Sequence, residues 1–129
     1  MFDRKLSRFF FVLMSSKWRR IPFALCVLAL AYGVFRAQPP PDLFLQSDKV
    51  LHVVAFFGLA LCTRLAFCNA RWLGVLAGLL LAAAGTEYLQ QWVQPLRMFS
   101  VYDAAANGVG VMLGVVAWVA LLRVCRARA

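Results

Sequence analysis

The stretch "TEYLQQWVQPLRMFSVYDAAANGVG", from Thr86 to Gly110, decides how this chain can fold, because it joins two of the most apolar runs in the sequence. The run before it extends from Trp72 to Val93, and the run after it extends from Val101 to Leu122. A helix of about 20 residues crosses a bilayer core of about 30 Å, and both runs reach that length. Yet the stretch also contains a Glu, an Arg, an Asp and an Asn, which are costly inside a membrane.

Two further apolar runs precede this region, Ile21 to Phe35 and Val50 to Phe67. The whole chain is 64% hydrophobic and only 15% charged, which leaves too little polar surface for a soluble domain of this length. Helices satisfy their backbone groups within one segment and so suit continuous apolar spans. We therefore predict an all-α polytopic membrane protein, a four-transmembrane-helix bundle with helices at about 21–36, 49–67, 72–93 and 102–123.

The two ends of the chain are basic. The first twenty residues hold only six consecutive apolar residues, which are too few to span a bilayer. We predict a basic amphipathic segment at 1–20 on the cytoplasmic surface, a transmembrane domain at 21–124 and a basic cytoplasmic tail at 124–129. A signal peptide is the alternative for the start of the chain, although Arg36 would hinder cleavage after Ala37.

Charge predicts the orientation. Fourteen Lys and Arg residues stand against five Asp and Glu, a net charge of +9, and most of the basic residues flank the ends of the chain and the link between the second and third runs. The positive-inside rule then places both termini in the cytoplasm of a bacterial inner membrane. Nucleic acid is not predicted as a partner, because no basic face interleaved with aromatic residues lies outside the apolar runs.

With this topology, nearly all polar residues able to do chemistry lie at one depth, close to the outer interface. Asp48 and His52 are four residues apart and share a helical face. Asp103 and Asn107 share a face of the fourth helix in the same way. The predicted polar cluster consists of Asp48, Lys49, His52, Glu87, Gln90, Arg97, Ser100, Asp103 and Asn107.

Glycines continue these faces along two helices. Gly110 and Gly114 extend the stripe that begins at Asp103, and Gly74 and Gly78 form a second stripe on the third helix. Small residues let membrane helices approach closely, so we predict that these four glycines pack against other helices.

Glu87 is the most informative member of the cluster. It lies about a turn and a half below the outer end of its helix, where a bare carboxylate costs about 2 to 3 kcal/mol or more. It must therefore be protonated, paired with Arg97, Lys49 or His52, or facing a wet cavity. Three interpretations stay open: a structural cluster that sets helix register, a ligand pocket open to the outer leaflet, and a proton relay.

Catalysis and cofactors have weaker support. If the protein is an enzyme, His52, Glu87 and Asp103 are the candidate catalytic residues, and Ser100 is either a nucleophile or a helix cap. A metal site is not predicted, because the chain has one histidine and no His-x-x-x-His pair. The chain also lacks a Gly-rich phosphate loop, so no cofactor is predicted.

The spacing of these residues resembles the VanZ-like family of small bacterial membrane proteins. The family's first block matches Asp48, Lys49, His52 and Phe56, and its second block matches Glu87, Gln90, Pro95, Arg97, Asp103 and Asn107. The founding member is associated with resistance to teicoplanin, an amphiphilic glycopeptide that acts at the outer membrane–wall interface. Antibiotic resistance is implied here by the resemblance alone.

From these observations we expect an inner-membrane protein that recognises an amphiphilic cell-envelope ligand, lipid-linked or glycopeptide-like. Lys49 and Arg97 would attract anionic head groups, and Glu87, Asp103 and Asn107 would orient them. The alternatives are a membrane-embedded enzyme that acts on a lipid-linked substrate and a structural subunit of an envelope complex. Expected partners are membrane lipids, together with a second copy or a larger membrane protein, because four short helices enclose little volume.

Overall fold

The structure is a computed structural model that describes residues 17–36, 41, 43–94 and 96–127. A short 3-10 turn, η1 (Lys17–Arg19), leads into four α-helices: α2 (Arg20–Phe35), α3 (Ser47–Ala66), α4 (Trp72–Val93) and α5 (Val101–Ala127). Every described element is helical, which confirms the predicted all-α fold. All four helices are long and apolar enough to cross a membrane, the first with η1 included, so the protein is a multi-pass membrane protein with four candidate spans.

The helix boundaries differ from the predicted ones at two places. α3 begins at Ser47, so Asp48 and Lys49 lie in its first turn. α5 continues to Ala127, beyond the predicted end at about 123, so the helix extends into the segment predicted as a basic tail. No Gly or Pro follows Leu122 to end the helix, which explains the extension. Most of the predicted amphipathic segment at 1–20 lies outside the described residues.

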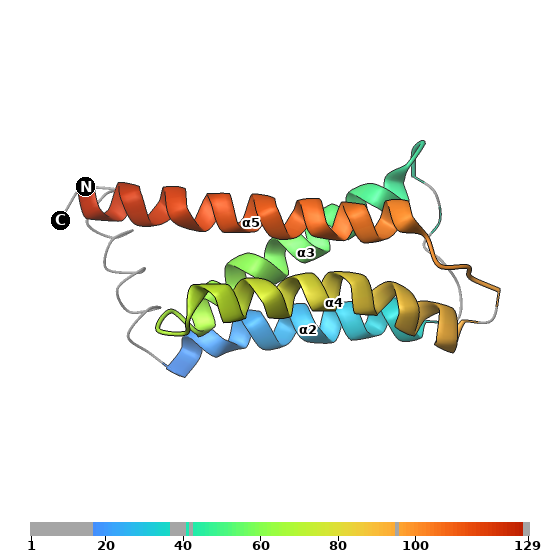
Figure 1. The fold of residues 1–129 in the computed structure, drawn as a ribbon, viewed down its shortest axis with the longest axis horizontal. Helices are drawn as coiled ribbons and strands as arrows, with labels where there is room; N and C mark the ends of the chain where they lie inside the picture. The colour runs from blue at the N-terminus through green and yellow to red at the C-terminus, as the bar shows by residue number, and fades with distance from the viewer. Residues whose placement is uncertain (1–16, 37–40, 42, 95, 128–129) are drawn as a thin grey trace.

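The closest helix pair is α3 with α5, which lie side by side in the bundle (Figure 1). Gly110 and Gly114 of α5 face the α3 backbone. A Cβ built on Gly114 would lie 2.7 Å from the Phe57 carbonyl oxygen, and one built on Gly110 would collide with the Val53 carbonyl oxygen. The two backbones approach this closely only because these positions carry no side chain.

Gly74 and Gly78 behave differently. Both are exposed on α4, and a Cβ built on either meets no heavy atom within 4 Å in the described part of the chain. The described helices therefore provide no packing partner for these two glycines. α4 instead turns another face inward, which carries Leu79, Ala83 and Glu87 at steps of four residues.

The buried core of the bundle is small. It consists of Phe56, Leu59, Ala60, Leu79, Ala83 and Val111, whereas most large apolar side chains are exposed on the outside of the helices. That pattern suits a lipid environment, in which exposed Leu and Val cost nothing and tight packing of small residues joins the helices.

Near the polar cluster, two side chains form hydrogen bonds at helix termini. Gln94 follows α4 in an extended conformation, as expected for a residue before a proline. Its side-chain amide donates to the carbonyl oxygens of Val34, at 3.0 Å, and Arg36, which ties the end of α2 to the end of α4. Ser100 accepts the backbone N–H of Asp103 at 3.2 Å and so caps the start of α5.

The opposite end of the bundle is closed by a buried arginine. Arg64 donates to the carbonyl oxygens of Cys68 and Ala70 in the α3–α4 link, and its guanidinium lies 4.6 Å from the ring centre of Trp72.

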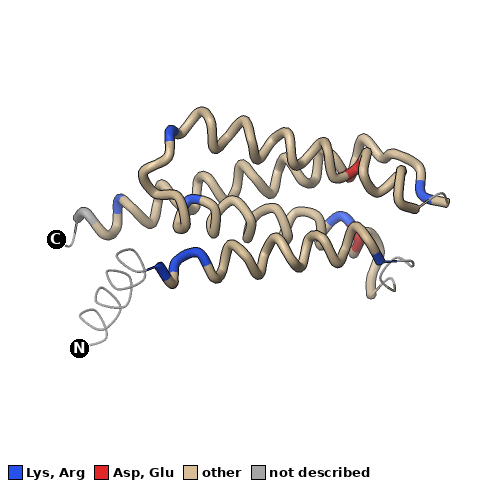
Figure 2. Tube along the Cα trace, turned by 90° about the horizontal axis from the view of Figure 1, so that it is seen from below, with Lys and Arg blue, Asp and Glu red and all other residues tan. Residues whose placement is uncertain are grey.

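The described acidic residues lie together toward the other end of the bundle, away from the Lys and Arg at the start of α2 (Figure 2). That end, where α2 and α4 finish and α3 and α5 begin, is called the polar end below.

Candidate functional site

Three helices meet at one point of the polar end, through His52 of α3, Glu87 of α4 and Asn107 of α5. His52 Nδ1 and Asn107 Oδ1 are 2.8 Å apart, and the same ring nitrogen lies 3.6 Å from Glu87 Oε1. Asn107 is fully buried and Glu87 is 2% exposed. A polar contact removed from water in this way is strong and specifies how the three helices pack.

The Asn107 amide fixes the hydrogen-bonding roles in this group. Its Nδ2 donates to Ala83 O at 3.0 Å, and lies 3.3 Å from both Thr86 Oγ1 and Glu87 Oε1. Asn107 Oδ1 is therefore the acceptor toward His52, whose Nδ1 carries the proton. The other ring nitrogen, Nε2, is left as an acceptor on the side of the ring that faces Arg97.

A second layer of charged residues covers this centre. Arg97, in the α4–α5 link, places Nη2 3.4 Å from Asp48 Oδ2, 3.4 Å from His52 Nε2 and 3.8 Å from Asp103 Oδ2. Lys49 Nζ lies 3.7 Å from Asp103 Oδ1. The Asp103 side chain is buried, whereas that of Lys49 is 41% exposed. Arg97 therefore joins α3 to the start of α5, and Lys49 adds a weaker, more hydrated pair.

Among the three candidate partners that the sequence offered for Glu87, the structure places His52 beside it, with Nδ1 3.6 Å from Oε1. Arg97 and Lys49 instead pair with Asp48 and Asp103 in the layer above. The buried carboxylate is thus held by one imidazole and one amide and is separated from the stronger cations.

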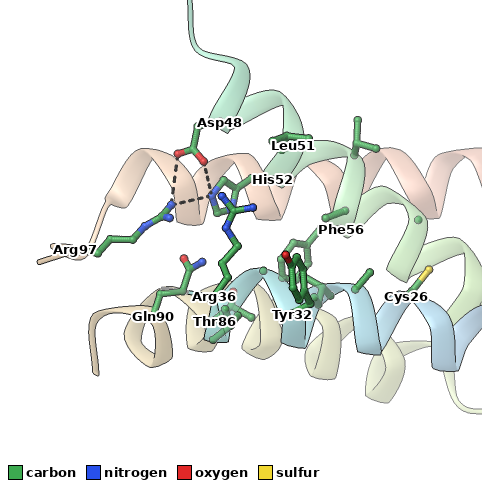
Figure 3. Close-up of a pocket in the computed structure, with 17 residues that line it drawn as sticks. Cys26, Tyr32, Arg36, Asp48, Leu51, His52, Phe56, Thr86, Gln90 and Arg97 are labelled. Carbon is green, nitrogen blue, oxygen red and sulfur yellow. Dashed lines mark hydrogen bonds and ion pairs between the residues drawn. The ribbon is translucent and has the colours of Figure 1, made fainter. Parts of the chain in front are cut away.

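A cavity of about 340 Å³ opens beside this network, between α2, α3 and α4. Its body is apolar and includes Ala29, Leu30, Gly33, Leu51, Val54 and Ala55. Polar side chains gather at one end of it, namely Arg36, Asp48, His52, Gln90 and Arg97, while Cys26 lies toward the other end (Figure 3). The cavity therefore has a polar head region and an apolar body.

The predicted cluster divides into residues that line the cavity and residues that lie behind its wall. Asp48, His52, Gln90 and Arg97 are lining residues, whereas the remaining five are not: Lys49, Glu87, Ser100, Asp103 and Asn107. Direct contact of Glu87, Asp103 and Asn107 with a head group, which the sequence led us to expect, does not follow from this arrangement. These buried residues hold His52 and Arg97 in place instead. Ser100 is occupied as a helix cap.

Gln90 has an unusual environment in the head region. Its side chain points toward the polar residues of the cavity (Figure 3), and the residue is only 6% exposed. Its Oε1 atom is buried and accepts no hydrogen bond from the described residues. A buried acceptor without a donor is rare in proteins, and it marks a place where a ligand group can donate.

Several residues that the sequence did not single out also shape the site. Arg36 and Thr86 line the cavity, Tyr32 forms part of its apolar wall, and Gln94 holds the end of α2 against α4. From the sequence, Arg36 could be recognised only as a charged residue at the end of a predicted span. The position of Gln94 directly before Pro95 indicated the end of a helix. Its two hydrogen-bond acceptors could not be predicted, because they are about 60 positions away in the chain.

Metal binding fits this geometry poorly. Asp48, His52 and Asp103 offer ligand atoms that lie within 4.8 Å of one another. Arg97 Nη2, however, stands 3.4 to 3.8 Å from one oxygen of each aspartate and from His52 Nε2. The guanidinium thus already supplies the positive charge that a metal ion would bring.

The chemistry available at the head region is anion binding and hydrogen bonding. Two guanidinium groups, of Arg36 and Arg97, face one carboxylate, of Asp48, among the lining residues. His52 lines the cavity and contacts the buried Glu87 behind its wall.

Neither curated proteins nor solved structures include a match to this chain. A family model described as VanZ/LLP1 matches residues 6–123. This range contains almost all of the described helices and every residue of the polar cluster. It extends the resemblance seen in the two motif blocks to most of the chain. The chain therefore belongs to the VanZ/LLP1 family.

Proposed function

We propose that this protein binds an amphiphilic cell-envelope molecule, lipid-linked or lipid-tailed, in the cavity between α2, α3 and α4. The observation that carries the proposal is the division of this one cavity into a charged head region and an apolar body. Its volume of about 340 Å³ falls within the range of about 300 to 1,000 Å³ that is typical of small-molecule sites. An amphiphile places its two chemically different ends in these two regions.

The wall of the cavity supports entry from the lipid phase. Tyr32 and Leu51 both line the cavity, yet they are 72% and 47% exposed on the outside of the bundle. In a membrane these side chains would be in contact with acyl chains. A lipid-tailed molecule could then move sideways into the cavity without exposing its tail to water.

The buried network behind the wall has a supporting role in this proposal. Glu87 and Asn107 hold the His52 ring, and Asp103 holds Arg97. Side chains that are locked in this way keep a binding site in one geometry and reduce the entropy lost when a ligand binds.

The distribution of charge supports an orientation in the membrane. Most of the described Lys and Arg lie at the ends of the helices opposite the polar end (Figure 2). Among them are Arg19 and Arg20 at the start of α2, Arg71 directly before α4 and Arg123 near the end of α5. By the positive-inside rule, that end would face the cytoplasm in a bacterial inner membrane, with both termini inside. The head region of the cavity would then face outward, where envelope precursors and lipoglycopeptides are encountered.

A blocked cavity tests the proposal. Gly33 lines the cavity, and a Cβ at this position meets no heavy atom within 4 Å, so Gly33→Leu should fill the space while leaving the fold intact. Gly85→Leu is the matched control, because Gly85 is exposed on α4, is equally unobstructed and lies outside the cavity. Purified protein would be incubated with a radiolabelled bacterial envelope lipid extract and, separately, with teicoplanin, and the bound ligand would be quantified.

We expect the wild type and Gly85→Leu to retain a labelled amphiphile and Gly33→Leu to lose it. Equal retention by all three proteins would contradict the proposal. Chemical conversion of the bound lipid by the wild type would show an enzyme instead, with His52 as its general acid–base. If no amphiphile binds and Glu87→Gln only lowers thermal stability, the network is a structural device.

A further inference from the structure

The lining of the head region specifies the charge of the bound group. Arg36 and Arg97 face the cavity from two different elements, and Asp48 is the only carboxylate among the lining residues. Arg97 contacts Asp48, His52 and Asp103 through one nitrogen, Nη2, of a guanidinium that has five N–H donors. Arginine side chains bind phosphate oxygens through several parallel hydrogen bonds. The head region therefore suits a phosphate better than a cationic or neutral group.

Gln90 adds a second requirement. Its buried Oε1 lacks a donor among the described residues, and a phosphate diester has no proton to give. A hydroxyl group beside the phosphate would donate to Oε1 and remove the unsatisfied acceptor. Gln90 and Arg97 lie at the same end of the cavity (Figure 3), so one head group can reach both.

The apolar body sets the size of the tail. The lining residues along α2 extend from Cys26 to Arg36, the residue directly after the helix, a distance of roughly 15 Å at a rise of 1.5 Å per residue. The cavity volume of about 340 Å³ is near the lower end of the range for ligand sites, which favours one narrow chain over two.

We propose that the amphiphile is a single-tailed phosphodiester with a polyol head group, such as a glycerol-phosphate lipid with one chain in the cavity. Arg36 and Arg97 bind the phosphate, Gln90 accepts from a head-group hydroxyl, and the tail lies along α2 toward Cys26. This assignment rests on the proposed function, because it names the chemistry of the ligand for the same cavity.

A set of dodecyl probes tests each part of the assignment. The full-length protein, in nanodiscs of phosphatidylcholine, would be titrated with dodecylphosphoglycerol, which has tail, phosphate and hydroxyls. Methyl dodecyl phosphate lacks the hydroxyls, dodecylglycerol lacks the phosphate, dodecylphosphocholine is zwitterionic, and glycerol phosphate lacks the tail. We expect dodecylphosphoglycerol to bind at least about tenfold more tightly than each of the others, because each lacks the hydroxyl hydrogen bond, the phosphate contact or the tail contact.

Three variants connect this preference to named residues. Arg36→Gln should weaken dodecylphosphoglycerol binding about tenfold, whereas Arg123→Gln, an exposed arginine at the other end of α5, should leave it unchanged. Gln90→Leu should remove the preference for the glycerol head over the methyl ester and leave methyl-ester binding as it was. That separation distinguishes a lost hydroxyl contact from a misfolded protein.

The outcomes separate the two levels of the proposal. If all dodecyl probes bind equally well and Arg36→Gln has no effect, the head-group assignment is overturned while amphiphile binding stands. Tight binding of glycerol phosphate without a tail would overturn the lipid assignment. If none of the probes binds and the envelope extract also fails to bind, both proposals are wrong.

Discussion

His52 on α3 and Asn107 on α5 share a hydrogen bond of 2.8 Å in the interior of the bundle, 55 positions apart in the chain. The same asparagine donates to α4 through Ala83 and Glu87. One amide thus joins three helices, next to the cavity to which we assign ligand binding.

Replacement of Asn107 should be strongly destabilising. Asn107→Ala removes the partners of His52 and Glu87 and leaves buried polar groups without hydrogen bonds, at a cost of about 1 to 3 kcal/mol for each group. The melting temperature of the protein in detergent should fall by several degrees. Asn69→Ala, a change at an exposed position in the α3–α4 link, is the control and should leave the melting temperature nearly unchanged. Equal melting temperatures for the two variants would show that the network contributes nothing to stability.

The same substitution at two glycines should have opposite effects. Gly114→Ala places a Cβ 2.7 Å from the Phe57 carbonyl oxygen, so it should push α5 away from α3 and destabilise the bundle. Gly78→Ala meets nothing within 4 Å and should stabilise its helix by about 0.5 to 1 kcal/mol. Thermal unfolding of both variants measures the signs. A stabilised Gly114→Ala protein would be incompatible with the close α3–α5 contact.

The two layers of the site should differ in energetic coupling. A double-mutant cycle on His52 and Asn107 should give a larger coupling free energy than one on Lys49 and Asp103. The reason is exposure: the Lys49 side chain is 41% exposed, and ion pairs with that much access to water contribute about 0 to 1 kcal/mol. The cycles need the four unfolding free energies of each pair, measured at two salt concentrations. Only the Lys49 pair should weaken as salt is added.

Gln94 should control the end of α2. Its side-chain amide donates to the carbonyl oxygens of Val34 and Arg36 and so ties the end of α2 to the end of α4. Gln94→Ala should therefore loosen the wall of the cavity. Hydrogen–deuterium exchange should rise in the last turn of α2 and amphiphile binding should weaken. Gln91→Ala, at an exposed position of the same helix, is the control. Unchanged exchange at Val34 in the Gln94 variant would remove this role.

Much of the fold follows from the sequence because the bilayer sets the length of a span. Four apolar runs predicted four helices, and alternation of direction brought Asp48, Glu87 and Asp103 to one end although they are far apart in the chain. The pairing of particular side chains did not follow, because it depends on helix rotation. Glu87 had three candidate partners by depth alone, and the packing of α3 and α4 against α5 brings His52 next to it.

The sequence allowed a pocket beside the polar cluster but did not indicate which apolar residues line it. Its α2 wall is uniformly apolar from Ile21 to Phe35, so nothing distinguished Gly33 or Leu30 from residues that face lipid. The predicted packing of the α4 glycines also rested on an ambiguous pattern. A stripe of small residues permits a close contact, but it does not show that a partner is present, and α4 turns Gly74 and Gly78 outward.

Photo-crosslinking tests the central claim, that an amphiphile occupies the cavity between α2, α3 and α4, most directly. Dodecylphosphoglycerol with a diazirine at the end of its tail would be added to the protein in nanodiscs, and the labelled residues would be identified by mass spectrometry. We expect labelling concentrated at Cys26, Leu30 and Gly58, which line the apolar body, and competition by the unlabelled compound. Labelling spread evenly over lipid-exposed residues such as Leu73 and Leu81 of α4, without competition, would contradict it.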